Sequence, residues 1–325
     1  MGSGDRSADR RPAPIVIERQ GSFSAGGSLI GDPAVSSTLC DHGHVEFQIP
    51  PDPREVGLFM WHSSSAAVWQ NRWDGGEGFQ SIFLRKGFPV YLWDGPRVGR
   101  GNLPCEALET APREGQDQIN FFAWRFGETF PEWYPDVQFP IGDAEAWNQA
   151  MRARYEEFDT VENAKLEAVA AAEALERTGP AVLVTNSAGG LRGLLAAIDS
   201  SNVKAIVAYE NVGFVFPDSE EPKQAAGPYG PIYVPDEQFL KLTRIPMIFV
   251  WGDHLEQSRG PSTVLPENER FVELVNSRGG QAELLKLRDA GLKGNTHLPF
   301  ADLNNLEVAD LLMQYLERHE LAGRR

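Results

Sequence analysis

The sequence predicts an α/β fold in which a mostly parallel central sheet carries helices on both faces. Short apolar runs rich in β-branched residues alternate with longer helical patterns, as is typical of parallel strands joined by helices. The chain has 325 residues, of which 42% are hydrophobic, and this is enough for one large core. We therefore expect a single domain over residues 15–325, preceded by a disordered tail over residues 1–14.

The first half of the chain is expected to supply outer strands and an insertion. Extended segments are predicted near residues 15–20, 44–49 and 56–61, then a helix over 78–86 and a strand over 89–93. The stretch from Gly95 to about Gly142 is rich in Gly, Pro and aromatic residues, and such long stretches are usually lids or binding loops. We therefore expect a cap-like insertion over about 95–160. Its aromatic residues fit either a cap over the substrate pocket or a cluster that packs the insertion onto the body or a dimer surface.

The second half alternates strand and helix more regularly. Helices are predicted over 144–158, 161–178 and 191–197, and strands over 182–186, 204–210 and 245–253. The last two strands end in carboxylates, Glu210 and Asp253. His297 lies in a Gly-Asn-Thr-His loop before the final helix. Three chemically useful side chains therefore follow predicted strands or lie in loops.

Ser187 stands at the junction of a strand and a helix, in the run V-L-V-T-N-S-A-G-G over residues 182–190. A serine on such a sharp turn, among small residues, is the sequence form of the nucleophile elbow of α/β-hydrolases. Ala188 and Gly189 leave room for strained backbone, and the helix N-terminus would face negative charge developing on a substrate. Thr185 replaces the first glycine of G-x-S-x-G, so the motif alone fits an ordinary Ser/Gly-rich turn about equally well.

The chain order serine, acid, histidine is the order of this fold. Serine becomes a nucleophile when a base takes its proton and a carboxylate holds that base in one tautomer. His297 is the preferred base, whereas His62 ends an early strand, where it would shape an oxyanion loop. Spacing does not separate Glu210 from Asp253 as the acid, because the carboxyl ends of parallel strands share one sheet edge.

The remaining histidines give no strong metal signal. Asp41, His42 and His44 could be read as a cluster of ligands, but no partner residues follow at a recognisable spacing. His254 is expected to make local hydrogen bonds, and His319 to lie on a solvated helix face. We expect neither a metal nor a cofactor.

A further likeness to a known family covers most of the chain from about Gly21 onward. Seven segments carry it: FQSIFLRKGF (79–88), WDGPRVGR (93–100), RFG (125–127), QFP (138–140), GDHLE (252–256), GNTH (294–297) and NNLEVAD (304–310). In these segments the chain resembles the dimeric bacterial α/β-hydrolase esterases known for two adjacent, disulfide-linked cysteines beside the oxyanion hole. The resemblance implies Ser187 as nucleophile, His297 as base and Glu210 as acid, with Asp253 supporting the histidine. It also implies an α/β-hydrolase fold, a small-molecule ester substrate and a homodimer.

The chain departs from that family beside the oxyanion hole. The paired cysteines of the family follow His-Gly, whereas this sequence reads His-Ser-Ser-Ser over residues 62–65, so the vicinal disulfide is absent. The backbone N–H groups of Ser64 and Ala188 are still expected to form the hole, because backbone donors do not depend on the side chain. The residues expected to line the substrate site are His62, Ser63, Trp93 and Trp124.

Charge and cysteine content restrict the partners and the compartment. The formal net charge of −16 argues against nucleic-acid and anionic-membrane partners. Cys40 and Cys105 show no metal or redox spacing and are read as free thiols, with a single disulfide as the less favoured alternative. Residues 1–14 lack the apolar core of a secretion signal and no apolar run could span a bilayer, so a cytoplasmic protein is expected.

These observations favour a serine hydrolase that cleaves a carboxylic ester through an acyl-enzyme. Two alternatives stay open from the sequence. A lactonase, amidase, C–C hydrolase or lyase could use the same triad on the same scaffold. A ligand-binding protein could also carry a vestigial triad, although it would have no reason to keep all three residues.

Overall fold

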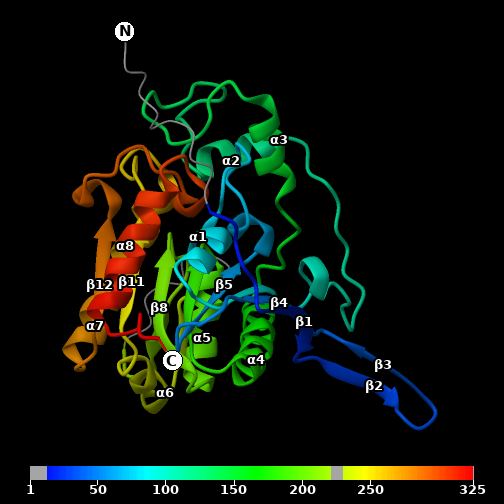
Figure 1. Cartoon of the computed structure of the whole chain (residues 1–325). Helices are drawn as coiled ribbons and strands as arrows, with labels where there is room; N and C mark the ends of the chain where they lie inside the picture. Colours follow the sequence, from blue (N-terminus) through cyan, green and yellow to red (C-terminus); the bar gives the residue numbers. More distant parts are fainter. Residues whose placement is uncertain (1–12, 221–229, 325) are drawn as a thin grey trace.

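The structure is a computed structural model that describes residues 13–220 and 230–324, and it is built around an eight-stranded sheet (Figure 1). The strand order is β1-β4-β6-β5-β7-β8-β11-β12. β1 and β4 run antiparallel to their neighbours, whereas the pairs from β6 to β12 are parallel. The strands are β1 Arg19–Ala25, β4 Gly43–Ile49, β5 Gly57–His62, β6 Val90–Asp94, β7 Ala181–Asn186, β8 Val203–Tyr209, β11 Met247–Trp251 and β12 Ala282–Lys286. The mostly parallel sheet predicted from the sequence is confirmed.

Helices cover both faces of this sheet. In β5, Phe59 and Trp61 enter one buried cluster, while Leu58 and Met60 enter the other, as the period of two in a strand requires. One cluster packs the sheet against α4 Val161–Thr178, α5 Gly189–Asp199, α6 Asp236–Leu242 and α7 Arg259–Ser277. The other packs it against α1 Phe79–Arg85 and α8 Asn305–Arg318. Among the described residues, no helix has both the length and the apolar character that crossing a membrane requires.

Several predicted elements differ in their bounds. α4 begins and ends where the sequence predicts, and the Thr160 hydroxyl caps its N-terminus by accepting from the N–H of Asn163 at 3.1 Å. The first edge strand starts at Arg19 rather than residue 15, since its pairing with β4 begins only there. The insertion contains α2 Gln116–Ala123 and α3 Ala144–Arg152, and α3 is shorter than the predicted helix over 144–158. Most of the predicted disordered tail over residues 1–14 lies outside the described residues.

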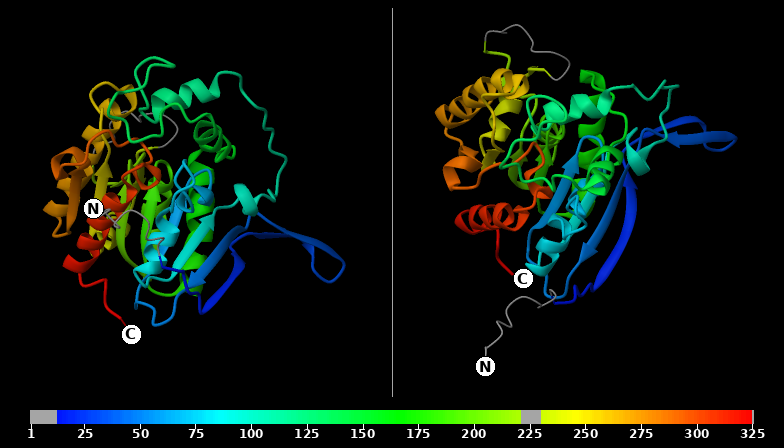
Figure 2. Two further views of the ribbon diagram at one scale, coloured as in Figure 1. Left: turned by 45° about the horizontal axis from the view of Figure 1, so that its top comes forward. Right: turned by 90° about the horizontal axis from the view of Figure 1, so that it is seen from above.

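A hairpin not expected from the sequence extends from the body beside β1, in all three views (Figures 1 and 2). It consists of β2 Ser28–Asp32 and β3 Ser36–Cys40, and in each view it lies away from the central sheet. Another small sheet pairs β9 Val215–Pro217 with β10 Ile232–Val234. The short 3-10 helices are η1 Ala66–Trp69, η2 Gly99–Gly101, η3 Leu287–Ala290 and η4 Pro299–Ala301.

The two cysteines are joined, so the prediction of free thiols is wrong. Cys40 ends β3 and forms a disulfide with Cys105 at the start of the insertion. Asp41 holds the same junction, because its carboxylate pairs with Arg97 at 2.8 Å and its N–H donates to Leu103. The 65 residues between the cysteines concealed this proximity in the sequence.

The aromatic residues of the insertion pack against one another. Phe121 lies 4.9 Å from Trp133 between ring centroids, and Trp133 stacks on Phe139 at 5.1 Å. Phe126 and Trp147 join the same cluster. These rings belong to the buried cluster that also contains Leu58 and Met60 of β5, so they pack the insertion onto the body.

Candidate active site

Ser187 lies on the turn between β7 and α5 with a backbone φ of 54°. This left-handed conformation is costly for a non-glycine residue and is expected of a nucleophile elbow. The turn is tied to the next strand, since Ser187 N donates to Tyr209 O and Ser187 O accepts from Val212 N, both at 3.1 Å. A Cβ at Gly190 would lie 1.6 Å from Asn211 Oδ1, so only glycine fits there. The predicted elbow geometry is present, and Ser187 is partly exposed.

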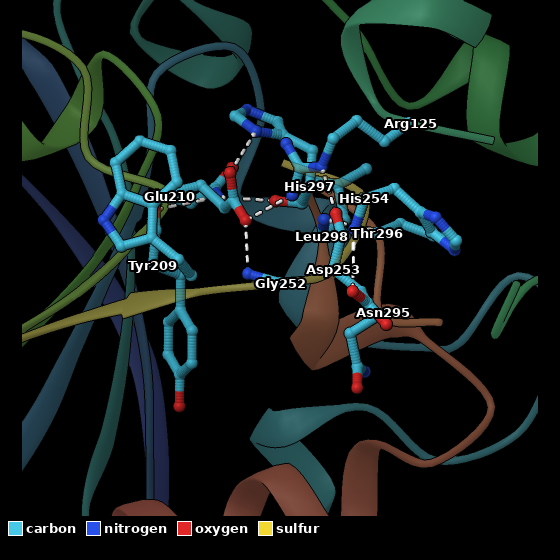
Figure 3. A network of polar contacts seen from close by, with 12 residues as sticks. Arg125, Tyr209, Glu210, Gly252, Asp253, His254, Asn295, Thr296, His297 and Leu298 are labelled. Atoms are coloured by element: carbon cyan, nitrogen blue, oxygen red, sulfur yellow. Dashed lines mark hydrogen bonds and ion pairs between the residues drawn. The ribbon is translucent and has the colours of Figure 1, made fainter. Parts of the chain in front are cut away.

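Glu210 follows β8 and connects His297 to a buried cation (Figure 3). Its Oε2 lies 3.3 Å from Nδ1 of His297, and its Oε1 accepts from Gly252 N at 2.5 Å and pairs with Arg125. Arg125 also donates from Nε to the carbonyl of Asp253 at 2.7 Å. Burial by itself would raise the pKa of Glu210, but the Arg125 charge and the His297 contact hold that pKa below its usual value. Glu210 is therefore a carboxylate that faces the imidazole.

Asp253, the alternative acid, has other partners. Its carboxylate accepts from Nε and Nη2 of Arg288 at 2.7 and 2.8 Å, and from Gly294 N at 2.9 Å. Of the two carboxylates that the spacing left open, Glu210 is the one that contacts His297. Asp253 fixes the loop that leads to the histidine, close to the supporting position that the resemblance implies.

The His297 loop is held by a second buried carboxylate, which the sequence did not indicate. Asp302 accepts from Thr296 N at 2.7 Å, from Thr296 Oγ1 at 2.8 Å and from Asn295 Nδ2 at 3.0 Å. Asp302 is 0% exposed, and burial raises its pKa to about 7 against the opposing effect of these hydrogen bonds. The residues on the N-terminal side of His297 are thus fixed by Asp302.

Backbone contacts bring His297 to the elbow. Asn186, directly before Ser187, donates from Nδ2 to the carbonyls of Tyr209 at 3.1 Å and His297 at 3.0 Å. The N–H of His297 donates to the carbonyl of Trp124 at 3.0 Å. Trp124, predicted to line the site, therefore touches the base through its backbone. No role for Asn186 was predicted from the sequence.

Backbone strain gathers at this edge of the sheet. Eight non-glycine residues in the described ranges have positive φ, and four of them belong to this site. Such conformations persist where surrounding contacts enforce them, and they are frequent at active sites. The four residues are Arg125, Ser187, Glu210 and His254.

The loop of residues 62–65, which the sequence predicts to be an oxyanion loop, differs in detail from the expectation. The N–H of Ser64 donates to Nδ1 of His62 at 3.0 Å, and the N–H of Ser65 reaches the same atom at 3.3 Å. Burial lowers the pKa of His62 to about 3, so the ring is neutral and Nδ1 can accept. In this state the Ser64 donor is engaged by His62, while Ala188 is the N-cap of α5 and is 2% exposed.

Two of the predicted lining residues lie in different surroundings. Ser63 is buried on the oxyanion loop, and Ser63 N would lie 3.3 Å from a Cβ at Gly189. Trp93 packs in the core, with ring centroids 5.8 Å from Phe59 and 6.2 Å from Trp61. Ser63 therefore lies beside the elbow, whereas the side chain of Trp93 lies in the buried core on one face of the sheet.

One group in the described part of the chain has the composition of a metal site. Asp136, Asp253 and His254 place one ligand atom each within 4.8 Å of one another. These side chains have protein partners, because Asp253 is paired with Arg288 and His254 Nε2 lies 2.9 Å from Asp136. The ring of His254 also stacks on Tyr134 at 3.7 Å. The His254–Asp136 contact attaches the insertion to the end of β11, next to the Asp253–Arg288 ion pair.

A surface groove of about 570 Å³ lies between α3 and the segment from η1 to Gly75. Its lining residues include Gln70, Trp73 and Gln149, and none of the three predicted catalytic residues. Since η1 follows the oxyanion loop, this groove adjoins the site without containing it.

The architecture and the elbow define an α/β-hydrolase fold. No protein-family model matches the chain. A solved structure described as a novel bacterial esterase is 25% identical and covers 96% of this chain and 99% of its own, with a TM-score of 0.78. A fungal protein named "Probable secreted lipase phiG" is 26% identical over 316 residues, which cover 83% of this chain and 84% of the fungal one.

These comparisons correct one expectation. The sequence was read as that of a cytoplasmic protein, but the fungal relative is named a secreted lipase. The Cys40–Cys105 disulfide agrees with this correction, since such bonds persist mainly in oxidising compartments. The absence of a recognisable signal in residues 1–14 was a weak basis for the compartment.

Proposed function

We propose that this protein is a serine hydrolase that cleaves carboxylic esters of small molecules through an acyl-enzyme. The observation that carries the proposal is the Glu210–His297 contact at 3.3 Å, beside an elbow serine with φ of 54°. The relatives named esterase and lipase support ester hydrolysis as the class of reaction. No cofactor enters this chemistry.

In the proposed reaction Ser187 Oγ attacks the ester carbonyl carbon while His297 takes its proton. Nδ1 of His297 faces Glu210, so Nε2 is the atom that accepts the proton. The tetrahedral intermediate collapses, Nε2 returns the proton to the leaving alcohol, and Ser187 keeps the acyl group. Water then attacks the acyl-enzyme while His297 takes its proton. The acyl–Oγ bond breaks, the carboxylic acid leaves, and Nε2 returns the proton to Ser187 Oγ.

The oxyanion needs donors beside Ser187. We assign Ala188 N–H, at the start of α5, and Ser64 N–H to this role. Because Ser64 N–H donates to His62 in this state, it must exchange that acceptor for the substrate oxygen. A small rotation of the loop peptide would do this, and the neutral His62 ring would keep its bond from Ser65.

A fluorophosphonate probe followed by mass mapping tests the nucleophile. An adduct on Ser187 that is absent in Ser187→Ala, together with p-nitrophenyl ester turnover, is the expected result. Labelling without ester turnover would point to another reaction on the same triad. Without an adduct, the protein would be a binding protein with a vestigial triad.

The acid is tested by two matched variants, Glu210→Gln and Asp253→Asn. Both replace a carboxylate by an isosteric amide, but only Glu210 contacts His297. Glu210→Gln should lower kcat by several orders of magnitude, whereas Asp253→Asn should weaken the loop and lower kcat far less. Loss of turnover in Asp253→Asn alone would overturn the assignment of Glu210.

We further propose that the protein is secreted and that its insertion, about 95–160, forms part of a cap. Secretion is supported by the name of the fungal relative and by the disulfide. The cap is supported by Trp124 and Arg125, which connect the insertion to His297 and Glu210. Fractionation of the native producer should place the protein outside the cell, with Cys40 and Cys105 oxidised.

We also propose the homodimer that the resemblance implies. Leu29, Val35 and Leu39 on the β2–β3 hairpin are 47%, 83% and 62% exposed, which supports a contact with a second copy. Light scattering after gel filtration should show a dimer, and Leu39→Glu should convert it to monomer. Val169→Glu, at a 53% exposed site on α4, is the control that should leave the dimer intact.

A further inference from the structure

Arg192 is a buried cation in the helix that follows Ser187. The other residues of α5 up to Ile198 are glycine, alanine, leucine and isoleucine, and Arg192 itself is 1% exposed. Removing a guanidinium from water costs several kcal/mol unless its donors find partners. The reaction proposed above makes no use of this residue, so its contacts require an explanation.

The guanidinium reaches back to the start of its own helix. Nη1 donates to the carbonyl of Ala188 at 3.1 Å. Nε forms an ion pair with Glu167 at 3.0 Å, and Nη2 lies 3.7 Å from Asp159. Alanine at the N-cap of α5 offers no side chain for capping, and the Arg192 guanidinium adds a side-chain contact to this turn.

Glu167 is in turn held in place from two sides. It accepts from Asn163 Nδ2 at 2.6 Å, one turn earlier on α4. A Cβ at Gly95, in the loop after β6, would lie 2.7 Å from a Glu167 oxygen, so that loop packs closely on the carboxylate. Burial raises the pKa of Glu167 to about 7, and the Arg192 charge opposes that rise.

The same charge cluster extends to the oxyanion loop. Gly95, against which Glu167 packs, follows Asp94, and Asp94 Oδ1 accepts from the N–H of Ala66 at 3.0 Å, directly after Ser65. Arg192 is also close enough to His62 to lower the pKa of that ring, together with His297 and Arg154. One end of the cluster thus contacts the elbow at Ala188, and the other end reaches the residue after Ser65 through Gly95 and Asp94.

Resting on the proposed function, we propose that Arg192 is a positioning residue that fixes the two sides of the oxyanion hole relative to each other. Oxyanion donors act at about 2.7–3.1 Å from the oxygen that becomes charged, so their separation must be held closely. A misplacement of about 1 Å at a reacting centre can cost about a hundredfold in rate. Since the charge on the oxygen develops in the transition state, a loosened hole should lower kcat without changing substrate affinity.

The test uses two variants of the whole chain. Arg192→Lys keeps the charge but cannot bridge Ala188 and Glu167 with one planar fork. The double variant Arg192→Met with Glu167→Gln removes one positive and one negative charge, so the buried Glu167 carboxylate is not left without its cation. We expect kcat for a p-nitrophenyl ester to fall about tenfold in Arg192→Lys and further in the double variant, with KM within about twofold.

Arg97→Lys is the matched control, because Arg97 makes a similar two-pronged pair with Asp41, at 2.8 and 2.9 Å, at the hairpin root. It should leave kcat and KM unchanged. Thermal melts of every variant correct the rates for unfolded protein. The role of Arg192 would be overturned if kcat were unchanged in both Arg192 variants. It would also be overturned if KM rose as much as kcat fell, or if the fraction of unfolded protein explained the loss of kcat.

The outcome can be separated from that of the proposed function. If wild-type protein gives no Ser187 adduct and no ester turnover, the hydrolase proposal itself fails. If the wild type turns over ester and is labelled while the Arg192 variants match it, only the positioning role fails.

Discussion

Arg125 and Glu210 form a fully buried ion pair behind His297, with side chains 1% and 0% exposed. The cation comes from the insertion and the carboxylate from the end of β8, 85 residues later in the chain. A buried carboxylate stays ionised only when a charge or several hydrogen bonds compensate for lost water. The insertion therefore contributes to the charge state of the site as well as to its surroundings.

Replacing Arg125 by methionine should shift the pH dependence of the reaction. Glu210 must be ionised to orient His297, and its pKa is depressed by the Arg125 charge. Without that charge the pKa of Glu210 rises, so activity should be lost at a higher pH as the solution is acidified. We expect kcat/KM at pH 7 to fall at least about tenfold, measured with a p-nitrophenyl ester from pH 4 to pH 9.

Arg288→Met provides the comparison, since Arg288 pairs with Asp253 rather than with Glu210. The acidic limb of its plot of kcat/KM against pH should coincide with that of the wild type. An unshifted limb in Arg125→Met would show that hydrogen bonds, such as that from Gly252, suffice to keep Glu210 ionised. Melting curves should also show a loss of about 3–5 kcal/mol in Arg125→Met, as expected when one partner of a buried pair is removed.

Asn186→Ala should reduce turnover without touching the triad side chains. The Asn186 amide joins the carbonyls of Tyr209 and His297, so its removal frees the histidine loop from the elbow strand. We expect kcat to fall about tenfold, because the base then spends less time in its productive position. Steady-state kinetics with a p-nitrophenyl ester measure this.

Asn276→Ala is the control for that variant. Asn276 also bridges backbone groups, accepting from Ala282 N at 2.8 Å and donating to Ala282 O at 2.9 Å, but it lies between α7 and β12. It should lose stability and keep kcat. Equal kcat losses in the two variants would mean that the Asn186 effect is general destabilisation.

The elements that depend on local sequence were predictable. α4 follows from its alanine-rich pattern and the Thr160 cap, and the turn at Ser187 follows from the small residues around it. Both are decided by neighbours within a few positions. The Glu210–Asp253 alternative was not decidable in this way, because both residues end strands at one sheet edge and only the contact with His297 distinguishes them.

Features that depend on distant partners were missed. The Arg125–Glu210 pair and the Cys40–Cys105 disulfide join residues 85 and 65 positions apart, with no spacing rule to relate them. The engagement of Ser64 N–H by His62 depends on the path of a loop rather than on residue type. Trp93 was predicted to line the site, but its side chain lies in the buried cluster on the sheet face covered by α4.

Removing the disulfide should lower stability and spare activity. The Cys40–Cys105 bond closes a loop of 65 residues, so the double variant Cys40→Ser with Cys105→Ser should cost up to about 4 kcal/mol in the chain-entropy view. The Arg97–Asp41 pair still fixes the hairpin root, and the triad residues lie outside the bridged region. Urea unfolding and ester kinetics measure the two effects. If the fully folded double variant lost much of its kcat, the disulfide would also order the insertion around Arg125.

Asp302 should make the stability of the protein fall as the pH rises. Its folded pKa is about 7, whereas an unfolded aspartate titrates near 3.8. Between these values the folded state binds the extra proton, so the stabilisation is complete below about pH 4 and is lost by about pH 7. A shift of about three units corresponds to at most about 4 kcal/mol.

Asp302→Asn isolates this contribution. The amide cannot titrate, but it can still accept from Thr296 N and donate to Thr296 Oγ1, so the loop of His297 keeps its contacts. Urea unfolding at pH 4.5, 6, 7 and 8.5 should show a smaller decrease in the free energy of unfolding for the variant than for the wild type. Glu167, which also has a pKa of about 7, is present in both proteins and cancels in the difference. If the free energies of unfolding of the variant and the wild type changed equally with pH, Asp302 would be ionised over this whole range. Its hydrogen bonds would then lower its pKa more than burial raises it.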